Sequence, residues 1–88
     1  MTVSSVDPQA LLSKWCTTLQ ERANEQGEEP VDPEDQLAVE NAIAAGVAVL
    51  AGEPAPAPSH KLPTRAILTK DLLITADLVR RALVQYQD

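Results

Sequence analysis

The chain has 88 residues, a net charge of −6 and an aromatic content of 2%, with one Trp, one Tyr and no Phe. This length indicates a single domain, 1–88, whose core must be built from Leu, Val, Ile and Ala. The acidic balance argues against nucleic-acid binding driven by phosphate contacts, which depends on Lys and Arg.

The single cysteine, Cys16, excludes an internal disulfide and a zinc site made of several cysteines. The opening segment MTVSSVD has neither the basic nor the apolar stretch of a secretion signal. Together these two features predict a cytoplasmic protein, because thiols stay reduced in that compartment.

The first predicted helix covers residues 8–26. Asp7 provides an N-cap and Pro8 occupies the first helical position, where its missing N–H costs nothing. Apolar residues then recur at helical spacing, and Gly27 is the expected C-cap.

The second predicted helix, 33–51, lies at the centre of the chain and includes eleven residues without a charge, 41–51. Asp32 and Pro33 repeat the Asp-Pro opening of the first helix, and Gly52 supplies the stop. The segment is too short and too charged at its start to cross a bilayer.

Three stripes run along this central helix, one of them made by Ala44 and Ala48. The bulky one contains Val39, Ile43, Val47 and Leu50, and the small one contains Ala38, Ala42 and Gly46. A helix that is apolar on all sides is buried on most of them, so we expect solvent to reach 41–51 rarely. The small residues would allow another backbone to come close.

A proline-rich connector, 52–63, separates the central helix from the last helical region. Its alternating Ala-Pro sequence cannot continue a helix and favours an extended conformation. The connector either returns the chain along the central helix or holds the last helix away from the first two.

The last helical region is predicted at 64–87. A heptad-like seam runs through Leu68, Leu72, Thr75, Val79, Ala82 and Tyr86. Apolar residues off this seam, among them Ile74 and Leu78, indicate that the helix is covered on more than one side. Two alternatives remain open: a helix beginning near Thr69 after a separate turn at 64–68, and short strands at 66–68 or 72–74.

The sequence contains no pattern typical of an enzyme. The only histidine, His60, lies in the connector, and the acidic residues of 28–35 lack the spacing of a calcium loop. Glycine-rich phosphate loops are also missing from the sequence. We therefore predict no catalytic, cofactor-binding or metal-binding residues.

These observations predict an all-α protein, a small three-helix or four-helix bundle completed by dimerisation or by a partner. The expected function is a non-enzymatic protein–protein interaction module: an adaptor, an assembly factor or a small regulatory or inhibitory subunit. Its partner would be another protein, including a second copy of the chain, rather than nucleic acid or a membrane. The predicted partner-binding residues are Glu28, Glu29, Asp32, Ala42, Gly46, Arg80 and Arg81.

Two other functions are weighed against this one. The first is a DNA-associated transcriptional regulator, because the segment from Thr69 to Leu83 has features of a helix-turn-helix with Arg80 and Arg81 in its second helix. The interval between Thr69 and Val79 is about three residues too short for a helix, a turn and a second helix, and no glycine marks the turn. The second is a structural subunit of a larger enzyme complex.

Overall fold

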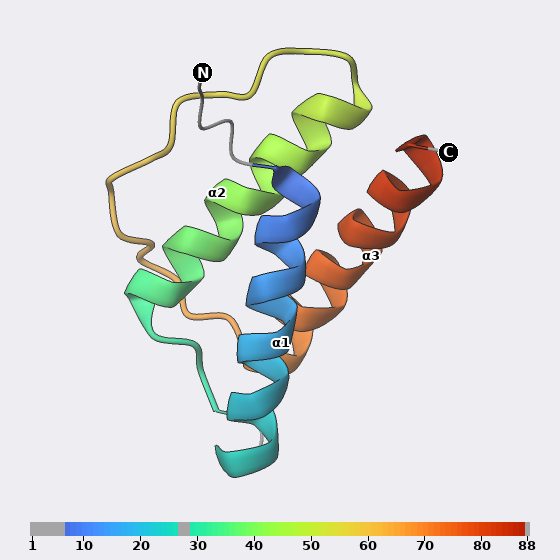
Figure 1. Cartoon of the computed structure of the whole chain (residues 1–88). Coiled ribbons are helices and arrows are strands. Elements are labelled where there is room, and N and C mark those ends of the chain that lie inside the picture. Colours follow the sequence, from blue (N-terminus) through green and yellow to red (C-terminus); the bar gives the residue numbers. More distant parts are fainter. Residues whose placement is uncertain (1–6, 27–28, 88) are drawn as a thin grey trace.

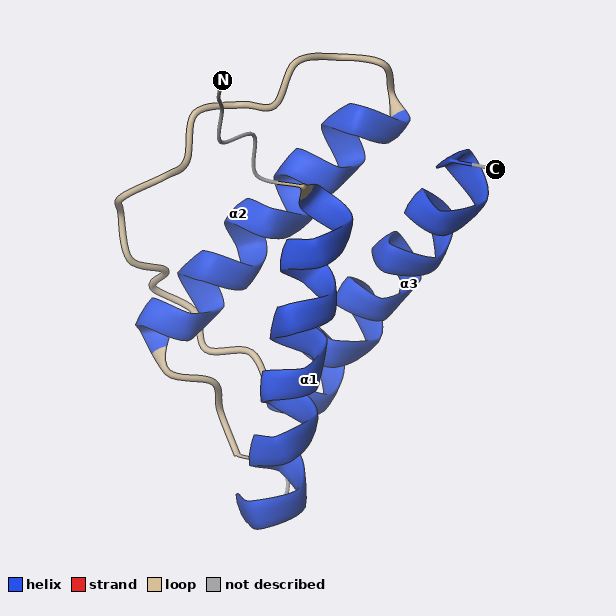
Figure 2. Ribbon diagram, in the orientation of Figure 1, coloured by secondary structure: helices blue, strands red, loops and turns tan. Residues whose placement is uncertain are grey.

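The computed structural model describes residues 7–26 and 29–87 and contains three helices: α1 (Pro8–Gln26), α2 (Pro33–Leu50) and α3 (Thr69–Gln87). Each helix packs against both of the others (Figure 1). Figure 2 shows helices joined by loops, and no strand occurs within the described ranges. The prediction of an all-α, three-helix bundle is confirmed.

The two Asp-Pro openings form helix starts by different means. At α1, the backbone N–H of Gln9 donates to Asp7 Oδ1 at 3.1 Å, so Asp7 is the predicted side-chain cap. At α2, Asp32 holds the N-cap position and its carbonyl accepts from the Gln36 N–H at 2.8 Å, but its carboxylate caps nothing. The second predicted cap is therefore positional only.

The end of α2 is closed by a Schellman motif around Gly52. The Gly52 N–H donates to the Val49 carbonyl at 3.0 Å, and the Glu53 N–H donates to the Ala48 carbonyl at 2.8 Å. Gly52 has a φ of +75°, a conformation that residues with a Cβ rarely adopt. The predicted stop is confirmed, with Leu50 as the last helical residue.

The connector returns the chain along α2, which is the first of the two predicted paths (Figure 1). Asn41 fixes it at mid-length: Asn41 Nδ2 donates to the Ser59 carbonyl at 3.1 Å, and the Ser59 N–H donates to Asn41 Oδ1 at 3.0 Å. Farther on, buried Gln36 donates from Nε2 to the Arg65 carbonyl at 2.9 Å. Two polar side chains of α2 therefore hold the connector in place.

α3 starts at Thr69, five residues after the main predicted start at 64 and in agreement with the alternative of a helix that begins near Thr69. The chain before it pairs with the α1–α2 loop instead: the Val31 N–H donates to the Ile67 carbonyl at 3.0 Å, and the Thr69 N–H donates to the Glu29 carbonyl at 3.2 Å. Thr69 Oγ1 donates to the same carbonyl at 2.9 Å. Backbone groups used in this extended pairing are not available for a helical turn, so the helix begins only after it.

The core consists of eight buried apolar residues, seven of which lie in the helices, while Val31 lies in the α1–α2 loop. The eight residues are Leu12, Leu19, Val31, Val39, Ala42, Leu72, Ala76 and Leu83. No aromatic ring belongs to this set. The prediction of an aliphatic core is confirmed for the described residues.

The inward face of α2 differs from the bulky stripe predicted for it. The buried apolar positions are Val39, Ala42 and Gly46, whereas Val47 is 50% exposed and Ala44 is also exposed. The expectation that solvent rarely reaches 41–51 is therefore wrong for the face that carries Ala44 and Val47. Two neighbouring helices cover only part of the surface of α2. They cover the face with the small residues, because α1 and α3 can come closer to α2 there.

The inner seam of α3 is also displaced from the predicted one. It contains Thr69, Leu72, Ala76 and Leu83, all buried, with Val79 half-buried. Leu72 and Val79 belong to both seams, but Thr75 and Tyr86 of the predicted seam are exposed. Relative to the prediction, α3 is therefore rotated about its own axis, so that a different set of residues faces the core.

Substitution of Gly46 tests the close packing of α2. A Cβ at this position would lie 2.9 Å from Val79 Cγ1 and 3.2 Å from Leu12 Cδ1 and Leu83 Cδ1. We expect Gly46→Ala to lower the free energy of unfolding by about 0.5–2 kcal/mol, because overpacking outweighs alanine's better helix propensity. Urea unfolding followed by circular dichroism measures this.

Ala44→Gly, on the exposed face of the same helix, is the control for helix propensity and should cost about 1 kcal/mol. A Gly46→Ala protein as stable as the original chain would contradict tight packing at this position.

Candidate interaction surface

Two of the predicted partner-binding residues, Ala42 and Gly46, lie in the interior of the chain. Ala42 is fully buried, and the position of the missing Gly46 side chain is surrounded by Leu12 of α1 and by Val79 and Leu83 of α3. The small-residue face does allow a close approach, as the sequence predicts, but the approaching helices belong to the same chain. This face is not a free surface.

The predicted acidic surface is held to α1 by an arginine. Arg22 Nη1 forms an ion pair with Asp35 and lies 3.8 Å from Asp32 Oδ2. Glu29 is exposed, and its backbone carbonyl accepts the two hydrogen bonds from Thr69. Glu28 lies outside the described residues. A partner-binding role for Glu29 and Asp32 stays a prediction.

Arg80 and Arg81 share one carboxylate, that of Asp77. Arg80 Nη2 lies 2.7 Å from Asp77 Oδ1, and Arg81 Nε lies 2.8 Å from Asp77 Oδ2. The hydrogen bond from Arg80, followed by the charges of both arginines, lowers the pKa of Asp77 despite some burial. The two predicted cations are thus partly neutralised within their own helix.

The helix-turn-helix that was weighed as an alternative for this segment is contradicted by the structure. Thr69 to Gln87 form one continuous helix, so the segment contains no turn that would separate a first helix from a recognition helix. Arg80 also faces α1, where it lines a groove with Cys16. Binding of DNA by these arginines stays an untested prediction.

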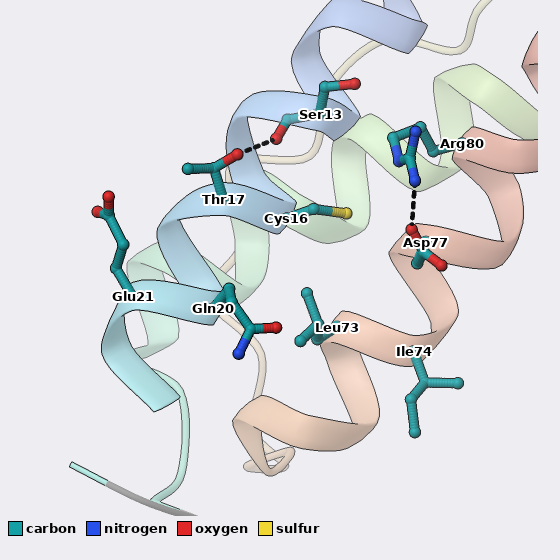
Figure 3. Close-up of a pocket in the computed structure, with 9 residues that line it drawn as sticks. All are labelled: Ser13, Cys16, Thr17, Gln20, Glu21, Leu73, Ile74, Asp77 and Arg80. Carbon is teal, nitrogen blue, oxygen red and sulfur yellow. Dashed lines mark hydrogen bonds and ion pairs between the residues drawn. The ribbon is translucent and has the colours of Figure 1, made fainter. Parts of the chain in front are cut away.

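A groove of about 600 Å³ lies between α1 and α3 (Figure 3). It is lined from α1 by Ser13, Cys16, Thr17, Gln20 and Glu21, and from α3 by Leu73, Ile74, Asp77 and Arg80. The Cys16 thiol has a raised pKa because of burial and the nearby Asp77 carboxylate, which outweigh the opposing effect of Arg80. A raised pKa keeps the thiol protonated at neutral pH, which disfavours its use as a nucleophile.

Beside this groove, α3 carries two exposed apolar side chains one turn apart, which we call the outer stripe: Ile74, 52% exposed, and Leu78, 61% exposed. Single exposed apolar residues are common on soluble proteins, but these two are neighbours on the helix surface, and Ile74 lines the groove together with half-buried Leu73. The sequence already showed that Ile74 and Leu78 lie outside the predicted seam. That placement was interpreted as a sign of coverage, whereas the structure leaves both side chains in solvent.

A second hollow, of about 630 Å³, lies between α2 and α3. Its apolar lining includes Ile43 and Leu72, but Glu40, Arg65 and Asp71 stand around it.

Among the residues that the structure describes, no three His, Cys, Asp or Glu side chains are grouped to hold a metal ion. In the same part of the chain, no helix is long and apolar enough to cross a membrane. Comparisons with protein families, curated proteins and solved structures gave no match. The geometry of the surface is therefore the basis for inferring a function.

The shared carboxylate predicts a pH-dependent contribution to stability. Because the folded-state pKa of Asp77 lies below its ordinary value, its contribution is fully present above that ordinary value and is lost as the pH falls through the folded-state value. Asp77→Asn should therefore lower the free energy of unfolding by about 0.5–1 kcal/mol at neutral pH, since its ion pairs are partly exposed.

Urea unfolding of both proteins between about pH 2.5 and pH 7 measures the difference, which should shrink toward the acid end. A difference of equal size at both ends would show that the charge of Asp77 is not its source.

Proposed function

We propose that this protein is a non-enzymatic protein–protein interaction module, an adaptor, assembly factor or small regulatory subunit, that binds its partner through the outer stripe of α3. The observation that supports this is the exposure of Ile74 and Leu78 side by side on a helix whose opposite face is fully used in the core. A partner would bury them without unfolding any part of the bundle.

The surroundings of the stripe suit helix-on-helix docking. Asp71 and Arg81 lie on the same face, one turn or less beyond Ile74 and Leu78, and both are exposed. Interfaces commonly have an apolar centre and a polar rim, and an amphipathic helix presents both in one row. The charges would orient the partner, while the two apolar side chains would supply most of the affinity.

A photo-crosslinking amino acid placed at position 78 tests this function in cells that naturally make the protein. We expect a discrete covalent adduct, because Leu78 would be covered by the partner. The same amino acid at exposed position 53, in the connector, is the control and should give none.

Adding Ile74→Gln should reduce the adduct at position 78 severalfold, because it removes the neighbouring apolar contact while keeping a good helix former. Absence of any adduct from position 78 would contradict the proposed function.

A further inference from the structure

The outward face of α3 carries a second heptad pattern, distinct from the inner seam. Asp71, Ile74, Leu78 and Arg81 follow one another at spacings of three, four and three, so they lie on one face of the helix. None of the four is buried in the chain. This row therefore has the spacing of a helix-pairing seam and is exposed, with Ile74 at the edge of the α1–α3 groove and Asp71 at the edge of the α2–α3 hollow.

The row is symmetric about Ala76. Ile74 and Leu78 lie two residues on either side of that position, and Asp71 and Arg81 lie five residues on either side. When a second α3 is laid against the first in the antiparallel direction, Ile74 of each copy meets Leu78 of the other. Asp71 of each copy then meets Arg81 of the other, so opposite charges face each other twice.

We propose that a second copy of this chain binds the outer stripe, in an antiparallel α3–α3 contact with two-fold symmetry. This inference rests on the proposed function, for which it names the partner. In a two-fold contact, residue i of one copy meets residue j of the other and j meets i, which is the arrangement that the row provides. A parallel pairing would instead place Asp71 against Asp71 and Arg81 against Arg81, and like charges oppose it.

The intrachain contact of Arg81 is compatible with this arrangement. The Arg81 side chain is 70% exposed and uses Nε toward Asp77, while its guanidinium carries further N–H donors. A carboxylate from the second copy would add to the Asp77 contact rather than replace it. Thr75 Oγ1 donates to the Asp71 backbone carbonyl at 3.1 Å, a contact that does not use the Asp71 carboxylate.

The contact is short, and this limits its strength. A helix of 19 residues is about 28 Å long, and the matched row covers roughly half of that length. A single pair of helices therefore buries less than the roughly 1,200–2,000 Å² of a standard interface. We expect a weak dimer, with a Kd of about 10–500 μM.

Analytical ultracentrifugation of the full chain from about 5 to 1,000 μM, in low salt, measures the dimer. The original chain should approach twice its monomer mass of 9.4 kDa as its concentration rises. Leu78→Gln should weaken the dimer about tenfold or more, because Leu78 meets Ile74 twice in the pair. Circular dichroism confirms that each variant remains folded.

Charge exchange tests the antiparallel register. Asp71→Lys and Arg81→Glu, made singly, should each weaken the dimer about tenfold, because each places like charges together twice. The two substitutions combined should return the Kd to within about threefold of the original. Arg81→Glu also loses its contact with Asp77, but the combined variant keeps that loss, so recovery must come from contacts between chains.

Glu53→Lys is the matched control, with the same change of charge as Asp71→Lys but in the connector, and should leave the dimer unchanged. A chain that stays monomeric at every concentration, or a dimer indifferent to the charge exchanges, would overturn the proposal. A monomer that still cross-links from position 78 to a different protein would overturn only the second copy as partner. The proposed function would stand in that case.

Discussion

The structure depends on the close approach of α1 and α3 to α2 at Gly46. No side chain occupies that position, and Leu12, Val79 and Leu83 fill the space from two directions. With no aromatic ring among its buried residues, the core gains its apolar burial from short aliphatic side chains packed at small helix separations. Small residues on α2 are thus a condition for the bundle rather than a surface for another protein.

Hydrogen bonds also join the loops to each other and to α2. The short pairing of 29–31 with 67–69 closes one end of the bundle, where the α1–α2 loop and the start of α3 meet. It buries Val31 and satisfies the backbone and side chain of buried Thr69. Asn41 secures the connector against α2 at mid-length, and Gln36 holds the Arg65 carbonyl just beyond its end. Polar contacts thereby hold a long connection that has no apolar residue in the core.

The sequence correctly predicted those helix ends that depend on interactions within one helical turn. The Asp-Pro openings and Gly52 placed the starts of α1 and α2 and the end of α2, because caps and stops act within one helical turn. The start of α3 was left open between residue 64 and Thr69, because it depends on a pairing between Pro30 and Leu68, 38 residues apart in sequence. The facing of α2 and α3 was missed: apolar residues surround both helices, so periodicity alone did not distinguish the inward face.

The apolar residues that surround α3 also include those of the candidate surface, Ile74 and Leu78. Three helices that each contact both others use one face of α3, so a second apolar row on that helix has no intrachain role. Asp77 lies between the two faces and binds Arg80, which lines the groove with α1, and Arg81, which points toward solvent. The arginines thus belong to different surfaces, and only Arg81 lies on the face with Ile74 and Leu78. Arg80 and Arg81, which the sequence placed together among the partner-binding residues, therefore lie on the groove side and on the outer side of one helix.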